Sequence, residues 1–306
     1  MTAARRCVFF LLRLRNSRFL LSLHTLNLSY VPKSGIIAGW MAGLGLLVAG
    51  FALRAQPLQG IAFYDVDRLY DTVASPFGRD RQFLPHGEMR WTGERYRRKV
   101  AQTAAAIDSL GLPLVALYGV ENEAVVRDVV AACTGDYVYL FRTTDSYSGL
   151  DFALLYFGDR FFPDRVDAGH FWMTVAGELR GAGRVCLLLS ASDRYIEYKI
   201  DAQRRRYPAE RLLVAGRTAE VEPQRYGLSE PLAAARRAGR GTRRAGNKWE
   251  MRSNLLIDTA FHVSRGDVYA RRWLFDASGE MPWATYTRRR YDGGPSANLP
   301  VFCYFR

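Results

Sequence analysis

Short apolar runs alternate with amphipathic helical segments along most of this chain, and that alternation constrains its fold more than any other feature of the sequence. The runs at 60–66 and 114–120 have the length and composition of strands. Residues 92–110 instead place apolar side chains at helical spacing after Thr92, a suitable N-cap. Strands that alternate with helices indicate an α/β fold.

The same periodicities predict the remaining elements. We expect further strands at 136–142, 151–157, 170–179, 184–192, 211–216, 255–264 and 299–305, helices at 121–134 and 194–206, and a long basic loop at 236–247. With 306 residues, 49% of them hydrophobic, the chain can bury a sizeable core, which excludes a disordered or collagen-like protein. Its four cysteines lack metal-ligand spacing, which excludes a zinc ribbon.

Residues 1–55 have the pattern of a leader that precedes an α/β domain at 56–306. Residues 1–56 contain seven basic residues and no acidic one, so they carry more than half of the net charge of +13. The run 36–53 is apolar and free of charge, and Ala55 follows it closely. Basic residues, an apolar run and a small residue form the layout of a secretory signal. We therefore expect an exported protein, periplasmic or secreted, cleaved near Ala55.

A membrane anchor is the competing interpretation of 36–53, because its 18 residues nearly span a hydrocarbon core of about 30 Å. A membrane would then be a partner only through this segment. The leader also leaves open whether the true start is Met1 or Met41. Three cysteines follow the leader, and we expect them to be buried apolar side chains rather than a disulfide framework.

A series of short blocks in the domain carries a family resemblance. The blocks are FYDVDRLYD at 63–71, the spaced set Asp80, Phe83, Pro85, Gly87, Trp91, Tyr96 and Lys99, LYGVEN at 117–122, SGLDFALLY at 148–156, KWE at 248–250, Ile257-Asp258 with Val263-Ser264, and SANLPV at 296–301. Their order and spacing together resemble the endonuclease/exonuclease/phosphatase superfamily, and most closely its bacterial branch with an FYNVENLFD-like opening. The resemblance covers roughly residues 60–306.

This resemblance implies the fold of deoxyribonuclease I, in which two mixed β-sheets pack face to face with flanking helices in a four-layer α/β sandwich. It also implies metal-assisted phosphoryl chemistry. In such enzymes a divalent cation held by Asn and Glu carries a phosphate oxygen, a His–Asp pair polarises the attacking water, and an Asp–Asn pair positions it. Each role requires a particular side chain, so each can be compared with this sequence.

The positions that would hold the cation are altered. Asp65 stands where the resemblance places the metal-binding Asn, and Gly119, which offers no side chain, stands where it places the Glu. Asp151 and Asp258 keep the acidic residues of their blocks. For Asp258 the structural interpretation is a carboxylate bonded to backbone or to an arginine such as Arg217.

The positions that would handle water and protons are altered as well. Ala191 falls where the family carries an imidazole, in a register that can slip by one residue. Arg217 and Ala219 replace the Asp–Asn pair, and Ala297 and Asn298 replace the terminal Asp and His. Alanine and asparagine exchange no proton near neutral pH, and a guanidinium is a fixed positive charge. We therefore expect a binding or scaffold pseudoenzyme that holds no cofactor.

A rearranged carboxylate site is the alternative that keeps an enzyme. Asp65, Glu121 and Asp258 are then the fallback ligands for Mg²⁺ or Mn²⁺, and the protein is a residual nuclease, phosphodiesterase or phosphatase. Residues 119 and 121 share a face if their strand continues. Other acids near the former site are Asp67, Glu220 and Glu222. The ordinary explanation for such acids is a set of solvated loop ends.

A polyanion-binding module is the third function that the sequence suggests. Arginines cluster at 204–206, 236–244 and 288–290, and Arg240, Arg243 and Arg244 are the candidates to contact the phosphates of nucleic acid or of another polyanion. Solvated helix faces and loops are the commoner explanation of such clusters.

Overall fold

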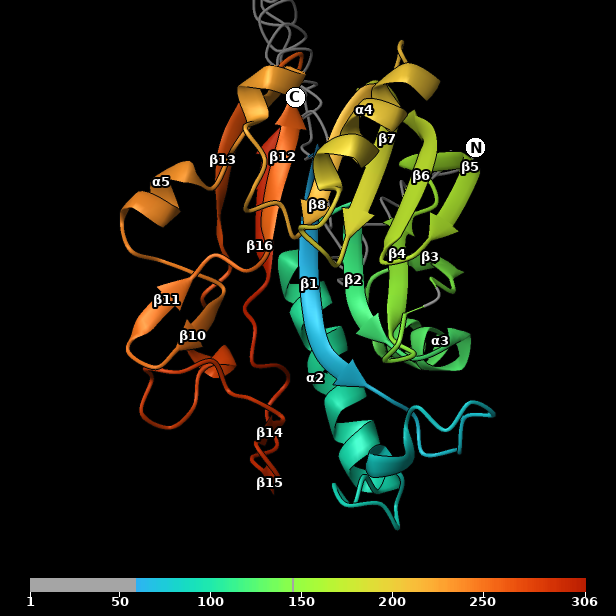
Figure 1. Cartoon of the computed structure of the whole chain (residues 1–306), viewed down its shortest axis with the longest axis vertical. Coiled ribbons are helices and arrows are strands. Elements are labelled where there is room, and N and C mark those ends of the chain that lie inside the picture. Colours follow the sequence, from blue (N-terminus) through green and yellow to red (C-terminus); the bar gives the residue numbers. More distant parts are fainter. Residues whose placement is uncertain (1–58, 145) are drawn as a thin grey trace, which may run out of the picture. The chain divides into compact units, whose positions relative to one another are not determined.

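The first of two large sheets is built around the earliest strand of the domain. The structure is a computed structural model and describes residues 59–144 and 146–306. The sheet contains β1 (Gln59–Leu69), β2 (Leu114–Val120), β3 (Tyr137–Arg142), β4 (Asp151–Phe157), β13 (Val263–Val268) and β16 (Val301–Phe305). Its order is β13-β16-β1-β2-β4-β3, and only β1 and β2 run parallel (Figure 1).

The second sheet also has six strands in mixed order. It contains β5 (Phe161–Gly169), β6 (Trp172–Leu179), β7 (Gly183–Ser190), β8 (Arg211–Gly216), β9 (Leu228–Ser229) and β12 (Asn254–Asp258). The order is β5-β6-β7-β8-β12-β9, with β7 and β8 parallel. Small hairpins are formed by β10 (Arg243–Ala245) with β11 (Lys248–Glu250), and by β14 (Tyr286–Thr287) with β15 (Arg290–Tyr291).

Helices cover the outer faces of these sheets. They are α2 (Gly93–Leu110), α3 (Glu123–Ala132), α4 (Ile196–Arg206) and α5 (Ala233–Arg237), with 3₁₀ turns η1 (Arg81–Phe83), η2 (Pro223–Tyr226) and η3 (Arg272–Leu274). The expected limits of the first helix are confirmed, because Thr92 accepts a hydrogen bond from the Arg95 amide and Gly111 ends the helix in a left-handed conformation. Asn122 caps α3 in the same way.

Along the strands of the second sheet, successive side chains point alternately toward the first sheet and away from it. Leu187 and Leu213 face the first sheet and join the large central core. Their neighbours Leu188 and Val214 face outward and pack with Ile200 of α4. Both faces of these strands are therefore buried, which explains their nearly unbroken apolar sequences. The expected α/β sandwich of two mixed sheets is confirmed.

Three details differ from the sequence-based expectations. The segment 255–264 is not one strand, because β12 belongs to the second sheet and β13 to the first. Strand β5 was not expected, since its exposed polar residues gave it no apolar run. The basic segment 236–247 is not all loop, because it includes the end of α5 and strand β10.

The leader predictions fall on residues outside the described ones, namely the boundary at 55, the apolar run 36–53 and the cleavage near Ala55. Within the part of the chain that the structure describes, no helix is long and apolar enough to cross a membrane. The three described cysteines are free thiols, with Cys186 and Cys303 buried and Cys133 half-buried, in line with their expected role.

Truncation of core leucines should distinguish the buried faces from the edge of the sandwich. Leu187→Ala and Leu188→Ala should each lower the free energy of unfolding by about 2–5 kcal/mol, because both side chains are fully buried on opposite faces of β7. Leu140→Ala, in the half-exposed edge strand β3, should cost less than either. Urea unfolding measures all three. A cost at Leu188 as small as at Leu140 would contradict the packing of α4 on this sheet.

Candidate functional site

The predicted site lies where β1 ends beside β2. Asp65 is 8% exposed and pairs with Tyr118 across the parallel ladder. The register then shifts, so that the next pairing joins Leu69 to Val120. The extra residues of β1 form a turn in which Asp67 and Arg68 both adopt left-handed conformations, with φ of 49° and 62°. Two consecutive non-glycine residues in that region are unusual, and the surrounding contacts must hold them there.

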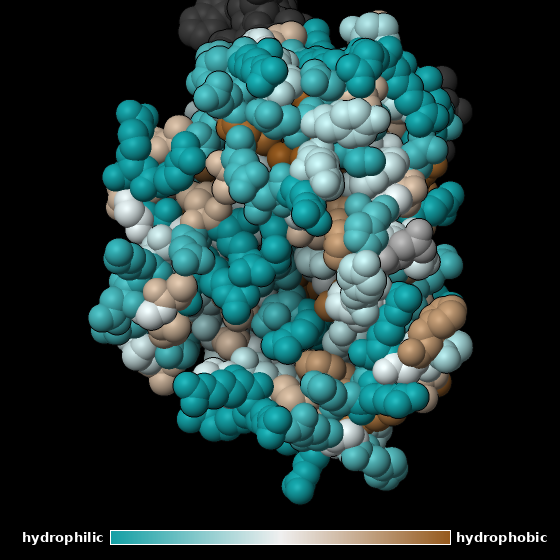
Figure 2. Space-filling model, in the orientation of Figure 1, coloured by the Kyte–Doolittle hydropathy of each residue, from teal (hydrophilic) through white to brown (hydrophobic). Residues whose placement is uncertain are grey.

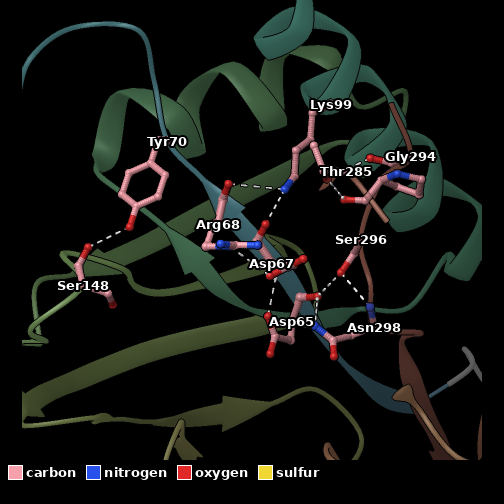
Figure 3. Close-up of polar contacts among 11 residues, drawn as sticks. Asp65, Asp67, Arg68, Tyr70, Lys99, Ser148, Thr285, Gly294, Ser296 and Asn298 are labelled. Carbon is pink, nitrogen blue, oxygen red and sulfur yellow. Dashed lines mark hydrogen bonds and ion pairs between the residues drawn. The ribbon is translucent and has the colours of Figure 1, made fainter. Parts of the chain in front are cut away.

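Two buried side chains hold this turn. The Asp65 carboxylate accepts a hydrogen bond of 3.0 Å from the Asp67 amide. The Lys99 ammonium, 1% exposed on the inner face of α2, donates to the carbonyls of Asp67 at 2.5 Å and Arg68 at 3.3 Å (Figure 3). Asp65 therefore acts here as an acceptor for backbone, and Lys99 fixes the turn from its other side.

Gly119 lies directly against the same turn. Its φ is +95°, a conformation that L side chains rarely adopt. A Cβ at this position would lie 3.4 Å from the amide nitrogens of Asp67 and Arg68 and 3.5 Å from Asp65 Oδ1. A glutamate in place of Gly119 would start from a strained backbone and would already be in contact with the turn at its Cβ.

The segment before β16 approaches Asp65 from the opposite side. Ser296 Oγ donates to the Asp65 carbonyl at 2.8 Å, and Asn298 Nδ2 lies 3.5 Å from the same oxygen (Figure 3). Asn298 is 2% exposed, and its Oδ1 has no hydrogen-bond partner among the described residues. The structure thus brings Asp65, Gly119 and Asn298 together.

The ends of β7 and β8 bring the next predicted positions into the same region. The Arg217 amide donates to the Ser190 carbonyl at 2.9 Å, and a Cβ on Gly216 would lie only 2.0 Å from that oxygen. Ala191 follows Ser190 and bonds to the carbonyl of Phe171, beside His170 on the β5–β6 turn. Residues 171 and 191 are far apart in the sequence, so the sequence did not predict that these segments meet. The Ala219 amide donates to the Asp193 carboxylate at 2.9 Å.

Burial dominates the electrostatics of the site. It raises the pKa of Asp65 to about 6, and the negative charge of Asp67 acts in the same direction. The hydrogen bond from the Asp67 amide and the positive charges of Arg217 and Arg252 oppose that rise. Burial also lowers the pKa of Lys99 to about 8. The sequence analysis gave no role to Arg252 or Lys99. A lysine on the apolar face of the helix at 92–110 could have been recognised as a candidate buried group.

Asp258 lies elsewhere. Asn254, at the start of β12, pairs with Gly216 at the site, whereas Asp258 is four residues further along the strand, a separation of about 13 Å. Its Oδ2 accepts from Arg204 at 2.7 Å and from the Leu212 amide at 3.2 Å. Although burial acts to raise it, the pKa of Asp258 is held below its usual range by hydrogen bonds from the Ala260 amide and from Arg204. The arginine partner is therefore Arg204 and not Arg217.

The fallback acids do not gather around Asp65. Glu121 accepts from the Asp71 amide at 2.8 Å, beyond the shifted end of β1, and Asp151 accepts from the Thr144 amide and hydroxyl, each at 2.8 Å. Asp71, Glu121 and Asp151 line a separate cavity of about 320 Å³. Among the described residues, no group of three His, Cys, Asp or Glu side chains is placed to hold a metal ion. The set Asp65, Glu121 and Asp258 is thus not a ligand cluster.

The candidate polyanion arginines are mostly engaged. Arg240 pairs with Asp267 at 2.8 Å, and Arg244 donates to the Glu280 carbonyl at 2.9 Å. Arg243 is half-buried in β10 opposite Glu250. Hydrophilic side chains cover most of the face in Figure 2, interrupted by small separate apolar areas.

This chain is similar in sequence to one protein family and in structure to several solved proteins. The model of the endonuclease/exonuclease/phosphatase family matches residues 60–181. Mannosyl-6-phosphatase of Bacteroides thetaiotaomicron VPI-5482 is similar over 81% of this chain and 99% of its own, with 13% identity and a TM-score of 0.51. TDP2 of Caenorhabditis elegans is similar over 87% of this chain and 80% of its own, with 12% identity and a TM-score of 0.53. D. rerio TDP2 in complex with a single-strand DNA product gives 12% identity, 82% and 100% coverage, and a TM-score of 0.52. A comparison with curated protein sequences finds no match.

At these identities the structural likeness defines the fold class, which is that of deoxyribonuclease I. The match over 60–181 adds a sequence resemblance, because this part of the chain is similar to the endonuclease/exonuclease/phosphatase family. Members of this family are metal-dependent phosphoric ester hydrolases that use Mg²⁺ or Mn²⁺.

Replacement of Asp65 should show how much its buried carboxylate lowers the free energy of unfolding. Because its pKa is raised to about 6, the folded chain retains a proton that the unfolded chain releases, so stability falls as the pH rises from about 4 to 6. Asp65→Asn keeps an acceptor for the Asp67 amide and removes this penalty. We expect its free energy of unfolding at pH 7 to rise by about 1–3 kcal/mol, with a flatter profile between pH 4 and 6.

Urea unfolding at a series of pH values measures this effect. Asp159→Asn is the matched control, because the Asp159 side chain is 72% exposed and its replacement should change neither the stability nor the profile. A less stable Asp65→Asn variant at pH 7 would show that the carboxylate is held by favourable charge interactions.

Proposed function

We propose that this protein is a binding or scaffold member of the superfamily that has lost metal-dependent phosphodiester hydrolysis. The observation that carries the proposal is the turn at Asp67 and Arg68, whose backbone lies against Gly119 at the position of the family's metal-binding Glu. Gly119 is therefore in contact with a turn of unusual conformation, which the buried Lys99 holds.

A divalent cation does not fit the donors that remain. Mg²⁺ and Mn²⁺ require several oxygen ligands in a compact arrangement. Asp65 is the acid left at the former metal position, and its Oδ1 accepts from the Asp67 amide. The Asp67 carboxylate turns to Arg68, 3.3 Å away. The charges of Arg217 and Arg252, which act on Asp65, further disfavour a cation there.

Asn298, which stands where the resemblance places the family's terminal His, has structural contacts that it shares with Ser296. Asn298 and Ser296 bond to the Asp65 carbonyl and to each other, so they support β1. Neither side chain exchanges a proton near neutral pH. The loss of both the cation and the base removes the two parts of the family's chemistry that cannot compensate for each other.

A rearranged hydrolase is the second candidate, and one observation favours it. Asp71, Glu121 and Asp151 line one cavity, and burial raises the pKa of Glu121 to about 7, near the value that suits a general acid or base. Any Mg²⁺- or Mn²⁺-dependent activity would then depend on Glu121 rather than on Asp65.

For the location of the protein, we propose export directed by residues 1–55, with cleavage near Ala55. The support is the charge pattern of the leader, in which basic residues precede the apolar run 36–53. An anchored form that retains this run is the alternative.

Gly119→Glu tests whether the turn blocks the metal position. The variant should bind no Mg²⁺ and should unfold more easily than Gly183→Glu, its matched control. Gly183 has a similar φ of +78°, but a Cβ there would meet nothing within 4 Å. Because both variants carry the backbone strain, we expect the additional loss at Gly119 to be about 1–3 kcal/mol from displacement of the turn. Equal losses, or metal-dependent stabilisation of Gly119→Glu, would contradict this account.

Metal titration and hydrolysis assays test the proposed function directly. Calorimetry with Mg²⁺ or Mn²⁺ should show no stoichiometric binding, and hydrolysis of p-nitrophenyl phosphate and bis-p-nitrophenyl phosphate with either metal should stay at the buffer rate. Asp65→Ala and Glu121→Gln should leave that rate unchanged. Metal-dependent turnover that Glu121→Gln abolishes would establish a rearranged hydrolase. Turnover that Asp65→Ala abolishes would show instead that the protein is active at the position that the family uses.

A further inference from the structure

We infer that Arg217 and Arg252 form a metal-independent binding site for a phosphate group at the former catalytic position. The inference rests on the proposed function, because it assigns to two guanidinium groups the charge that a cation supplies in a family hydrolase. It also names the ligand class of that site: orthophosphate or a terminal phosphate monoester carrying one proton.

The sheet register places the two arginines at the same edge of the second sheet. Gly216 of β8 pairs with Asn254 of β12 in antiparallel fashion. Arg217 directly follows Gly216, and Arg252 precedes Asn254 with Ser253 between them, so the chain leaves and enters the sheet at the same edge. Both backbones are anchored, since the Arg217 amide donates to the Ser190 carbonyl and the Arg252 amide to Thr242 Oγ1 at 3.0 Å. The bases of both side chains are thus fixed before any ligand arrives.

The guanidinium groups of Arg217 and Arg252 lie near enough to Asp65 to act on its charge, but neither is paired with it. Neither Arg217 nor Arg252 forms an ion pair or a side-chain hydrogen bond within the described part of the chain, whereas Arg204 and Arg240 pair with Asp258 and Asp267. Arg252 Nε is in addition buried and without a partner among the described residues. A buried donor left unpaired costs free energy, and a bound acceptor would recover that cost.

The charges and acceptors nearby select the ligand. Arg217 and Arg252 bring positive charge to Asp65, and the nearby negative charge of Asp67 is paired with Arg68. The balance is a net positive charge for an anion. Guanidinium groups bind phosphate oxygens through paired hydrogen bonds. Asn298 Oδ1 is a buried acceptor without a partner among described residues, and the Asp65 carboxylate is a second acceptor. A phosphate that carries one proton can donate to them, whereas sulfate, which has no proton at neutral pH, cannot.

Ligand titration of the full chain in EDTA tests the site. We expect calorimetry and thermal shift with orthophosphate to show saturable binding at one site. Arg217→Gln and Arg252→Gln should each weaken that binding by about tenfold or more. Arg205→Gln is the matched control, because Arg205 is exposed on α4 and forms no ion pair with described residues. Arg217→Lys should bind more weakly than the unmodified protein, and circular dichroism checks that every variant is folded.

Sulfate tests whether the acceptors Asp65 and Asn298 select the ligand or whether positive charge alone binds it. Sulfate should bind at least about tenfold more weakly than orthophosphate, because it cannot donate to Asp65 or Asn298. Equal binding of the two anions, no phosphate binding at all, or equal losses in Arg205→Gln and Arg217→Gln would overturn the inference. Since metal is chelated throughout, a failure here leaves the pseudoenzyme proposal intact, and metal-dependent turnover in the separate assay would refute that proposal alone.

Discussion

A single buried ammonium group determines the shape of the site. Lys99 reaches from α2 to the carbonyls of Asp67 and Arg68, and those two residues keep left-handed conformations that free peptides avoid. Burying an ammonium is costly unless oxygen acceptors surround it, which the two carbonyls provide. The turn lies against Gly119, and the amide of Asp67 within it donates to Asp65, so this contact and both residues meet at the same stretch of β1.

The exchange of cation for guanidinium gives the remaining residues a common explanation. In the family's chemistry a metal neutralises phosphate charge at the end of β1. Here Arg217 and Arg252 bring positive charge to that place from β8 and β12, and no cluster of described carboxylates competes for it. A site of this kind favours binding an anion over reacting with it, because an arginine neither releases a proton nor activates a water molecule.

Most of the fold could be predicted from the sequence because its local signals agree with its tertiary contacts. The helix after Thr92 and the strand at 114–120 have clear periodicities and end signals, and both occur as expected. The errors arise where local patterns carry no information about sheet membership. Residues 255–264 have one apolar pattern but divide between two sheets, and β5 is too exposed to produce an apolar run.

The sequence by itself determined the α/β architecture and the family resemblance, because these depend on local periodicity and on the identity of residues in ordered blocks. Only the tertiary structure decided that Asp258 pairs with Arg204, that Glu121 lines a cavity with Asp71 and Asp151, and that Arg217 and Arg252 lie at the same edge of the second sheet. The physical reason is that strand register and backbone turns are set by packing between distant segments. The two extra residues of β1 between Asp65 and Leu69 shift its register against β2 without leaving a local signal.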